Sequence, residues 1–352
     1  MKVALVIAGS IWFSPYVRIY TRLLESLSVD YSIISWNREG DDKPEGFQYN
    51  VNCHSPASFS AYRGYVKFIK KTIREQGFDK VIVFGPQMAC LLSSFLLVHY
   101  RNRYMIDYRD LSIEQKPGFR QLFSLMLKFS CLNVVSSPGF IKCLPKRKYY
   151  ISHNFDVKTV REAITKSTEG SFFRKDGIKV LTIGGIRDYS SNIEVVKALG
   201  NKAGIRLDFV GKGGAAEQIK EYCQIHAIHN IGFKGFYQKE EEPAYIQACT
   251  FMNIFYPRVI THDTALSNRF YNSLIYKKPM IVTKDTTQGN YAEEHRVGIV
   301  IADCGDLEQQ LHSFLECDFG DYATRCNNLL KSFLIDQEEF EIKVKQFVTS
   351  VH

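Results

Sequence analysis

Short apolar runs rich in β-branched residues alternate with longer stretches of helical hydrophobic spacing along most of the chain. Strands that are separated by helices pair in parallel through right-handed crossovers, so this alternation predicts parallel α/β sheets. In the first half the pattern predicts strands at 3–8, 31–36, 80–84, 103–107, 133–136 and 148–151, and helices near 16–27, 59–76, 87–98, 118–130 and 138–143.

The same pattern starts again after a polar stretch, 156–175, which is typical of a linker. The second half has predicted strands at 179–183, 206–210, 230–233, 251–255, 280–282 and 298–301, and helices near 190–200, 215–227, 240–248, 266–276 and 289–295. Three helices, 306–317, 321–333 and 337–350, complete the chain. We therefore expect two doubly wound, Rossmann-like domains, 1–155 and 176–335, that face each other across a cleft.

Composition adds limits to this picture. A chain of 352 residues with 45% hydrophobic and 23% charged side chains is typical of a folded, soluble protein of about two domains. Nine cysteines, an odd number without a Cys-x-x-Cys pair, argue against a disulfide framework and structural zinc, and favour a reducing cytosol. The run 88–98 is too short to span a membrane, and we disfavour a secretory signal at 3–17 because no cleavage site follows.

The positive charge lies in the first half. Residues 1–160 hold 22 Lys and Arg against 12 Asp and Glu, whereas the remainder holds 23 against 25. A solvated basic surface is the simplest interpretation of any one cluster. Several clusters in one half also favour an anionic membrane surface as a partner, and nucleic acid is a weaker alternative because no nucleic-acid-binding motif accompanies the charge.

Two glycine-rich loops follow strands of the second half. The strand 179–183 runs into Gly184, Gly185 and Arg187, and the strand 206–210 runs into a loop that contains Lys212 and Gly213. Glycines allow a ligand to approach the backbone, a following helix presents free N–H groups, and cations attract phosphate. A tight turn with a surface cation explains either loop alone, but together they favour a bound phosphate ester.

Two further stretches carry candidate binding residues. Phe236 follows the strand at 230–233 and is available to pack against a base. Asn268, Arg269 and Asn272 lie within about one turn of a predicted helix start, where they can reach a ribose or a phosphate. Helix capping by Ser267 or Asn268 is the alternative.

Several segments together resemble GT-B glycosyltransferases that build capsular, exopolysaccharide and lipopolysaccharide glycans. Residues 267–282 resemble the donor-site helix and its following strand, and 184–188 resemble the first donor-domain loop. Residues 107–111 resemble an Asp-x-His/Arg-Asp-Leu segment of the first domain, and 136–140 and 151–154 resemble its closing segments. The likeness extends along nearly the whole chain.

The resemblance implies the GT-B fold and transfer of a sugar from a nucleotide sugar, most simply a UDP-sugar, to a hydroxyl of a lipid-linked saccharide. It implies a cytoplasmic protein, peripheral on the inner face of the membrane, whose last helix, 336–352, crosses back to the first domain. No cofactor and no metal ligand are implied. Arg187 and Lys212 are expected to stabilise the departing diphosphate. On the acceptor side the expected residues are Gly9, Ser10, Asp107 and Arg109.

The chain departs from the family pattern at three places. Retaining members carry a Glu-x7-Glu pair where this chain has Thr264 and Asn272, both of which are therefore donor-binding candidates. A usual Lys is replaced by Asn192, and a frequent His by Arg109. These departures leave retention or inversion open, together with two alternatives: a catalytically silent module that binds a nucleotide sugar or a partner subunit, and a nucleotide-sugar epimerase.

An inverting enzyme needs a group that takes the acceptor proton. Asp107, Asp110, His262 and Asp263 are the candidates. Each has a structural alternative, because the two first-half aspartates can pair with Arg109 and the His-Asp pair can form a surface turn.

Overall fold

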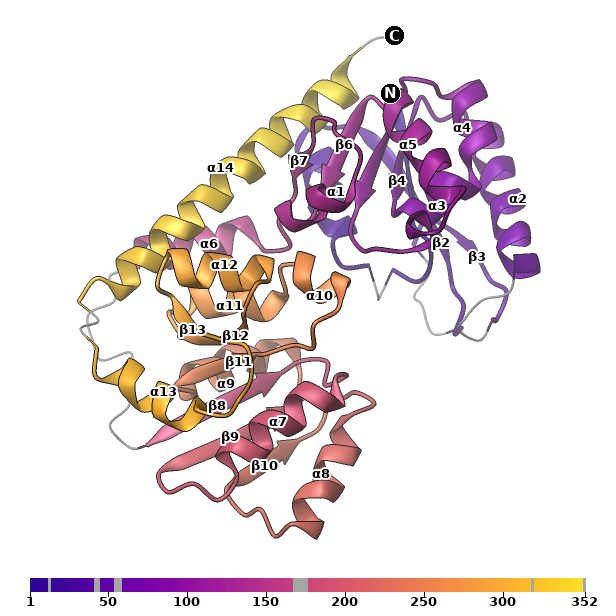
Figure 1. The fold of residues 1–352 in the computed structure, drawn as a ribbon. Helices are drawn as coiled ribbons and strands as arrows, with labels where there is room; N and C mark the ends of the chain where they lie inside the picture. Colours follow the sequence, from indigo (N-terminus) through magenta and orange to yellow (C-terminus); the bar gives the residue numbers. More distant parts are fainter. Residues whose placement is uncertain (12–13, 41–44, 54–58, 167–176, 318–319, 351–352) are drawn as a thin grey trace. The chain divides into compact units, whose positions relative to one another are not determined.

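The computed structural model describes the chain except residues 12–13, 41–44, 54–58, 167–176, 318–319 and 351–352. It divides into two compact units. Unit 1 comprises Met1–Asn154 and Ile335–His352, and unit 2 comprises Phe155–Leu334. Each unit is built on its own parallel sheet (Figure 1).

Unit 1 contains a seven-stranded sheet with the order β3-β2-β1-β4-β5-β6-β7, and all its pairings are parallel. The order reverses between β1 and β4, as in doubly wound folds. The strands are β1 (Lys2–Val6), β2 (Asp30–Trp36), β3 (Phe47–Tyr49), β4 (Lys80–Phe84), β5 (Tyr104–Tyr108), β6 (Leu132–Val135) and β7 (Tyr150–Ile151). The helices are α1 (Val17–Ser26), α2 (Phe59–Gln76), α3 (Pro86–Leu91), α4 (Ser93–His99) and α5 (Phe119–Phe129), with 3-10 turns η1 (Ile113–Gln115) and η2 (Pro138–Cys143).

Unit 2 contains a six-stranded parallel sheet with the order β10-β9-β8-β11-β12-β13, which reverses between β8 and β11. Its strands are β8 (Ile178–Ile183), β9 (Ile205–Val210), β10 (Ile231–Lys234), β11 (Phe251–Ile254), β12 (Met280–Thr283) and β13 (Gly298–Ile301). Its helices are α6 (Val157–Thr165), α7 (Tyr189–Leu199), α8 (Ala216–Ile225), η3 (Lys239–Glu241), α9 (Glu242–Ala248), α10 (Ile260–Thr264), α11 (Asn268–Ile275), α12 (Thr287–Glu294) and α13 (Leu307–Leu315).

Apolar side chains cover both faces of the unit 2 sheet, as an all-parallel sheet requires. One core cluster joins the sheet to α7, α8 and α13, and the other joins it to α6, α9, α11 and α12. The prediction of two doubly wound parallel sheets is confirmed.

Several predicted elements were wrong in detail. The segment expected to be a linker begins with helix α6, because Asp156 caps it by accepting from the Thr159 N–H at 2.9 Å and Val160 is fully buried. The rest of that segment, 167–176, lies outside the described residues. The helix expected at 87–98 breaks at Leu92 into α3 and α4, the helix at 138–143 is 3-10, and β3 and α10 were not predicted.

The last two expected helices are one continuous helix, α14 (Tyr322–Thr349), drawn in yellow in Figure 1. Its first half contributes Tyr322 through Phe333 to the unit 2 core, and its second half contributes Phe340 through Val348 to the unit 1 core. Between Phe333 and Phe340 the buried position is occupied by a polar residue, Gln337, so the apolar stripe is interrupted although the backbone stays helical. This interruption explains why hydrophobic spacing predicts two helices instead of one.

Candidate functional site

A pocket of about 320 Å³ lies in unit 2 at the carboxyl ends of the strands, beside the point where the strand order reverses. Loops after β8 and β11 meet there, which is where doubly wound sheets bind their ligands. The pocket is lined by Ile183, Gly184, Gly185, Arg187, Asp188, Tyr237, Lys239, Glu242, Tyr256, His262, Ala265, Ser267, Asn268, Arg269, Asn272 and Gln288.

The loop between β8 and α7 forms one wall of the pocket. Gly184 has φ +95°, a conformation that glycine adopts without steric cost. Arg187 is exposed, and within the described ranges its side chain has no carboxylate or hydrogen-bond partner. The N-cap of α7, Asp188, makes no side-chain cap, so the first N–H groups of this 11-residue helix are left without that partner. This wall is therefore electropositive.

The second glycine loop supports the first instead of lining the pocket. A Cβ atom on Gly211 would lie 2.0 Å from the Gly184 carbonyl oxygen, and one on Gly213 would lie 2.0 Å from the Ile186 carbonyl oxygen. The Ile186 N–H also donates to the Lys212 carbonyl at 3.0 Å. Gly213 does not line the pocket, and its missing side chain makes room for the neighbouring loop. Lys212 is exposed, lies over the Phe236 ring, and is not among the lining residues.

Arg269 is a buried cation behind the glycine loop. Its guanidinium donates to the carbonyl oxygens of Ile183 at 2.6 Å, Gly185 at 3.0 Å and Asn253 at 3.3 Å. The residue is 7% exposed, and no carboxylate among the described residues pairs with it. Arg269 therefore holds the loop in place and leaves its positive charge uncompensated by an ion pair.

A carboxylate that the sequence analysis missed lies in the same pocket. Glu242 is 8% exposed, and its Oε1 accepts from Asn272 Nδ2 at 2.5 Å. Its Oε2 accepts from the Tyr237 hydroxyl at 3.2 Å and from Lys239 Nζ at 2.6 Å. Burial and the nearby Glu242 charge raise the pKa of Tyr237 to about 12, so this hydroxyl keeps its proton and donates it.

His262 and Asp188 face each other across the pocket. His262 Nδ1 lies 3.3 Å from the Pro257 carbonyl oxygen, and Nε2 lies 3.9 Å from Asp188 Oδ2. The expected surface turn is instead the short helix α10, and Asp263 pairs with Arg258 at 2.8 Å outside the pocket.

Other expected donor-site residues have structural partners. The Thr264 hydroxyl donates to the Ile260 carbonyl at 2.6 Å, and Thr264 does not line the pocket. Phe236 is 57% exposed, and its neighbour Tyr237 lines the pocket instead. Ser267 caps α11 by accepting from the Phe270 N–H, as the capping alternative proposed.

Comparisons with solved structures extend along the whole chain. A sucrose-phosphate synthase from Thermosynechococcus elongatus matches with a TM-score of 0.69 and 12% identity over 99% of this chain and 100% of that one. Anabaena Alr3699/HepE in complex with UDP matches with a TM-score of 0.64 and 14% identity over 98% and 100%. The lipopolysaccharide outer core galactosyltransferase WaaB, in its apo form, matches with 0.68 and 12% over 98% and 100%. The chain has the GT-B fold. No protein-family model and no curated protein sequence matches it.

In this GT-B chain the acceptor-side candidates lie in unit 1, after β1 and β5. Arg109 Nη2 pairs with Asp107 Oδ2 at 2.6 Å and donates to Ser152 Oγ at 2.9 Å, and both paired residues are buried. The Tyr20 hydroxyl donates to the same Asp107 oxygen at 2.6 Å. The pairing of Asp107 with Arg109 that the sequence analysis gave as the structural alternative is thus present.

The remaining acceptor-side candidates are nearer the surface of unit 1. Asp110 is exposed just after β5, whereas Gly9 and Ser10 are partly buried. The Gly9 carbonyl accepts from the Trp36 N–H at 3.1 Å. Gly9 and Ser10 precede residues 12–13, which lie outside the described part of the chain.

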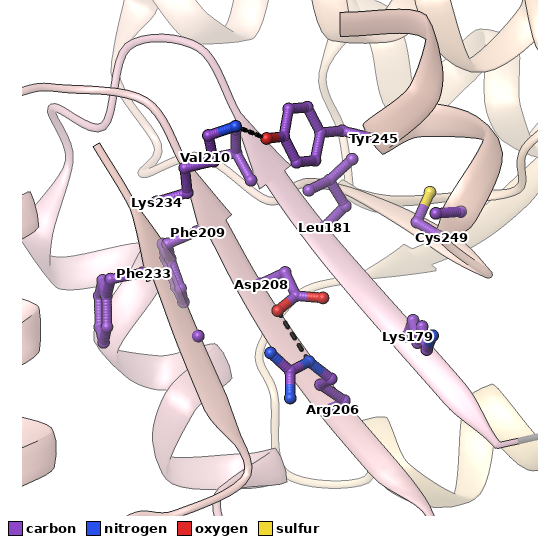
Figure 2. A pocket seen from close by; sticks show the side chains of 12 residues that line it. Lys179, Leu181, Arg206, Asp208, Phe209, Val210, Phe233, Lys234, Tyr245 and Cys249 are labelled. Atoms are coloured by element: carbon purple, nitrogen blue, oxygen red, sulfur yellow. Dashed lines mark hydrogen bonds and ion pairs between the residues drawn. The ribbon is translucent and has the colours of Figure 1, made fainter. Parts of the chain in front are cut away.

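A second pocket of about 330 Å³ lies along the sheet face of β8, β9 and β10, away from the glycine loops (Figure 2). Two of its three cations are paired, since Arg206 pairs with Asp208 at 2.9 Å and Lys234 with Glu241 at 2.9 Å, and Lys179 is the third. Lys234 also donates to the Tyr245 hydroxyl, as the dashed line in Figure 2 shows. This pocket does not include the glycine loop after β8 or the N-terminus of α7.

Two kinds of feature are absent from the described residues. Within the described ranges, no group of three or more His, Cys, Asp or Glu side chains is arranged to hold a metal ion. Among the helices described, none is both long enough and apolar enough to cross a bilayer.

Proposed function

We propose that this protein transfers a sugar from a nucleotide sugar to a hydroxyl group and that the unit 2 pocket holds the donor. The observation that carries the proposal is the pair of uncompensated guanidinium groups, Arg187 and Arg269, at the glycine loop. Arg269 is 7% exposed, and burying a cation without a counter-ion is costly, so an anionic ligand offsets that cost; the exposed Arg187 adds a second positive charge beside it.

A diphosphate suits this site better than a monoanion. The loop from Gly184 to Arg187 leads to the N-terminus of α7, where main-chain N–H groups and the helix dipole favour negative charge. A diphosphate leaving group gains charge as its bond to the sugar breaks, and preorganised cations stabilise that charge. The reaction in this proposal uses no metal ion and no cofactor, since Arg187 and the buried Arg269 supply the positive charge.

The compared structures support the choice of substrates. One of them was solved with UDP, which supports a UDP-sugar as the donor. Another is named for transfer to the lipopolysaccharide outer core, which supports a lipid-linked saccharide in surface polysaccharide synthesis as the acceptor. We place the reaction at the cytoplasmic face of the membrane.

A basic face of α2 supports peripheral binding to an anionic membrane. Arg63, Lys67, Lys70, Lys71 and Arg74 recur every three or four residues and so share one side of this helix. Four of them are exposed, and Lys70 is partly buried. Near an anionic surface each contributes about 1 kcal/mol of attraction.

Vesicle flotation tests the membrane proposal. Replacing Lys67, Lys71 and Arg74 together by Gln removes about 3 kcal/mol, which is roughly a 100-fold weaker partition onto phosphatidylserine vesicles. Binding of the unaltered protein should also decline as salt rises from 0.05 to about 0.5 M, since exposed charges are screened. A matched control replaces Lys197, Lys220 and Lys331 of unit 2. Equal losses in both triple variants, or no binding at low salt, contradict a role for α2.

The donor proposal is tested by isothermal titration with UDP. Arg187→Ala should weaken UDP binding by roughly 10- to 100-fold, the size of one lost charge-assisted hydrogen bond. Lys212→Ala should have a smaller effect, because Lys212 does not line the pocket. Arg206→Ala in the second pocket is the control and should leave UDP binding unchanged. A larger loss of UDP affinity from Arg206→Ala than from Arg187→Ala would indicate that the donor binds in the second pocket, and it would contradict the proposal.

A silent nucleotide-sugar-binding module is the second candidate, because the Thr264 hydroxyl bonds to its own helix where the family pattern has a carboxylate. Both candidates bind UDP, so product formation separates them. Incubation of the purified chain with UDP-sugars and a membrane lipid extract should transfer radiolabelled sugar to lipid. UDP binding without transfer to any acceptor favours the silent module, and conversion of the donor sugar without an acceptor indicates an epimerase.

A further inference from the structure

One corner of the unit 2 sheet lacks the apolar cover that the rest of that sheet has. The side chains of β9 alternate between its two faces, and Leu207 and Phe209 enter the core on one of them. Figure 2 shows Arg206 and Asp208 on the other face, beside Lys179 of β8. An all-parallel sheet normally buries both faces under apolar side chains. This charged corner is therefore an exception, and it forms the floor of the second pocket, of about 330 Å³.

Two cations are neighbours on this floor. The strand register pairs Lys179 with Arg206 in adjacent parallel strands, and like charges at such positions repel each other. Asp208 compensates only one of them, because its Oδ1 accepts from Arg206 Nε at 2.9 Å. Lys179 Nζ has no partner among the described residues. The third cation, Lys234, is paired with Glu241. The floor thus keeps an unpaired positive charge, which favours an anionic ligand.

These side chains also keep hydrogen-bonding atoms that no described residue uses. Arg206 donates through Nε, which leaves its two terminal nitrogens, Nη1 and Nη2, available. A guanidinium group presents parallel N–H donors that match two oxygens of one phosphate group, and the Lys179 ammonium adds a further donor. Asp208 Oδ2 is an open acceptor next to them. A ligand with one anionic group and one or more hydroxyl groups satisfies all of these atoms.

A glycine in β10 gives the pocket its depth. A Cβ atom on Gly232 would lie 2.7 Å from both Arg206 Nη2 and Asp208 Oδ1, so the missing side chain lets this pair lie against the strand. A glycine inside a strand frequently marks a place where another group approaches closely. Tyr245 and Cys249 of α9 form the adjoining wall. The volume is near the lower end of the range for small-molecule sites, about 300–1,000 Å³, so the ligand is small.

This pocket is separate from the donor pocket at the strand ends. The two pockets have no lining residue in common. Helix α9 contributes to both, because Glu242 in its first turn lines the donor pocket, whereas Tyr245 and Ala248 line the second pocket. Both pockets can therefore be occupied at the same time.

We propose that this corner of unit 2 is a second ligand site, which binds a small phosphomonoester that carries hydroxyl groups. Lys179 and Arg206 hold the phosphate group, whose nearly two negative charges at neutral pH match two cations. Asp208 Oδ2 accepts a hydrogen bond from a hydroxyl group of the ligand. A carboxylate brings only one negative charge and matches the two cations less well. The proposal does not depend on sugar transfer, since no residue of the donor pocket takes part in it.

Isothermal titration with glycerol 3-phosphate tests the site. The titration is run with and without saturating UDP, and one equivalent of glycerol 3-phosphate should bind in both cases. Inorganic phosphate lacks the hydroxyl-bearing part, and glycerate has a carboxylate in place of the phosphate. Each should bind roughly 10-fold or more weakly than glycerol 3-phosphate, and neutral glycerol should not bind at the same concentrations.

Four variants of the full-length protein locate the site. Lys179→Gln and Arg206→Gln should each weaken glycerol 3-phosphate binding by roughly 10- to 100-fold, the size of one lost charge-assisted hydrogen bond. Gly232→Ala changes no charge but displaces the guanidinium group, so it should weaken binding too. Lys220→Gln is the matched control, because it removes a charge from α8, which packs on the other face of the sheet, and it should bind normally. Melting followed by circular dichroism shows whether each variant is folded.

Each contrary result removes a stated part of the proposal. Loss of glycerol 3-phosphate binding when UDP is added means that the ester occupies the donor pocket, and it overturns the second site. Equal behaviour of Lys179→Gln and Lys220→Gln, or no binding of the ester to the unaltered protein, overturns it as well. Equal affinity for inorganic phosphate or for glycerate overturns the assignment to a phosphomonoester. Absence of UDP binding contradicts the proposed function alone, because the titration without UDP still reports on this site.

Discussion

Gly213→Ala should displace the neighbouring loop between β8 and α7, to which Gly213 does not belong. A Cβ atom there would lie 2.0 Å from the Ile186 carbonyl oxygen, 2.4 Å from its carbonyl carbon and 2.7 Å from its nitrogen. All three are backbone atoms, so no side-chain rotation relieves the contact. Relief requires the loop before Arg187 to move by about 1.5–2 Å, the difference between the shortest of these contacts and ordinary packing.

The expected size of the effect follows from that displacement. Forced overpacking costs about 1–3 kcal/mol. A loss of about 2 kcal/mol corresponds to a fall of about 4–8 °C in melting temperature for a unit of this length. A misplacement of about 1 Å in a binding loop also costs up to about 100-fold in its function, so we expect UDP affinity to fall by at least about 10-fold.

The neighbouring glycine provides a matched control. A Cβ atom on Gly214 would meet no atom within 4 Å, so Gly214→Ala adds the same methyl group to the same loop without a clash. Melting followed by circular dichroism and UDP titration should show losses for Gly213→Ala and almost none for Gly214→Ala. Equal behaviour of the two variants refutes the loop-support argument. Loss of UDP binding without a lower melting temperature shows instead that Gly213 contacts the ligand directly.

Three other predictions concern buried charged or titratable groups. Lys80 Nζ donates to the Phe347 and Ser350 carbonyls at the end of α14, so Lys80→Met should destabilise unit 1 by about 1–3 kcal/mol and speed amide exchange in the last turns, whereas Lys70→Met should not. Burial lowers the pKa of His153 below its usual 6.5, so as pH falls the unfolded chain takes up a proton before the folded chain does. The free energy of unfolding therefore has its full value above about pH 6.5 and declines as pH falls below it. Chemical denaturation between pH 7.5 and 5 should show this decline, His153→Gln should reduce it, and the exposed His312→Asn should not. Arg269→Met should weaken UDP binding more than uridine binding in titration, and equal weakening would mean that the Arg269 charge does not act on phosphate.

The fold could be predicted from the sequence because its strands are short, apolar and regularly spaced. Period and composition identify such strands directly, and a single restart of the pattern indicates two sheets. Helix α6 was missed because polar residues surround its few buried positions. The three-residue strand β3 was missed because it is too short to show a period.

The pocket could be predicted only in part. Gly184, Gly185, Arg187, His262, Asn268, Arg269 and Asn272 were named from the sequence and line one pocket. The individual roles of these residues could not be predicted from the sequence. Arg269, for example, donates hydrogen bonds to the carbonyls of Ile183 and Gly185, more than 80 positions away in the chain. Glu242 was missed for the same reason: it is 30 positions from Asn272, and only the folded sheet brings the two together.

Helix α14 makes the two ends of the chain interdependent during synthesis. Unit 2 is one uninterrupted stretch, and all of its core residues are translated before the α14 residues that belong to the unit 1 core. Unit 1 receives Phe340, Val344, Phe347 and Val348 from α14, although its own strands are made before unit 2. The unit 1 core therefore cannot be completed until unit 2 has been translated, and a stop codon before Phe340 leaves the amino-terminal sheet without these four side chains.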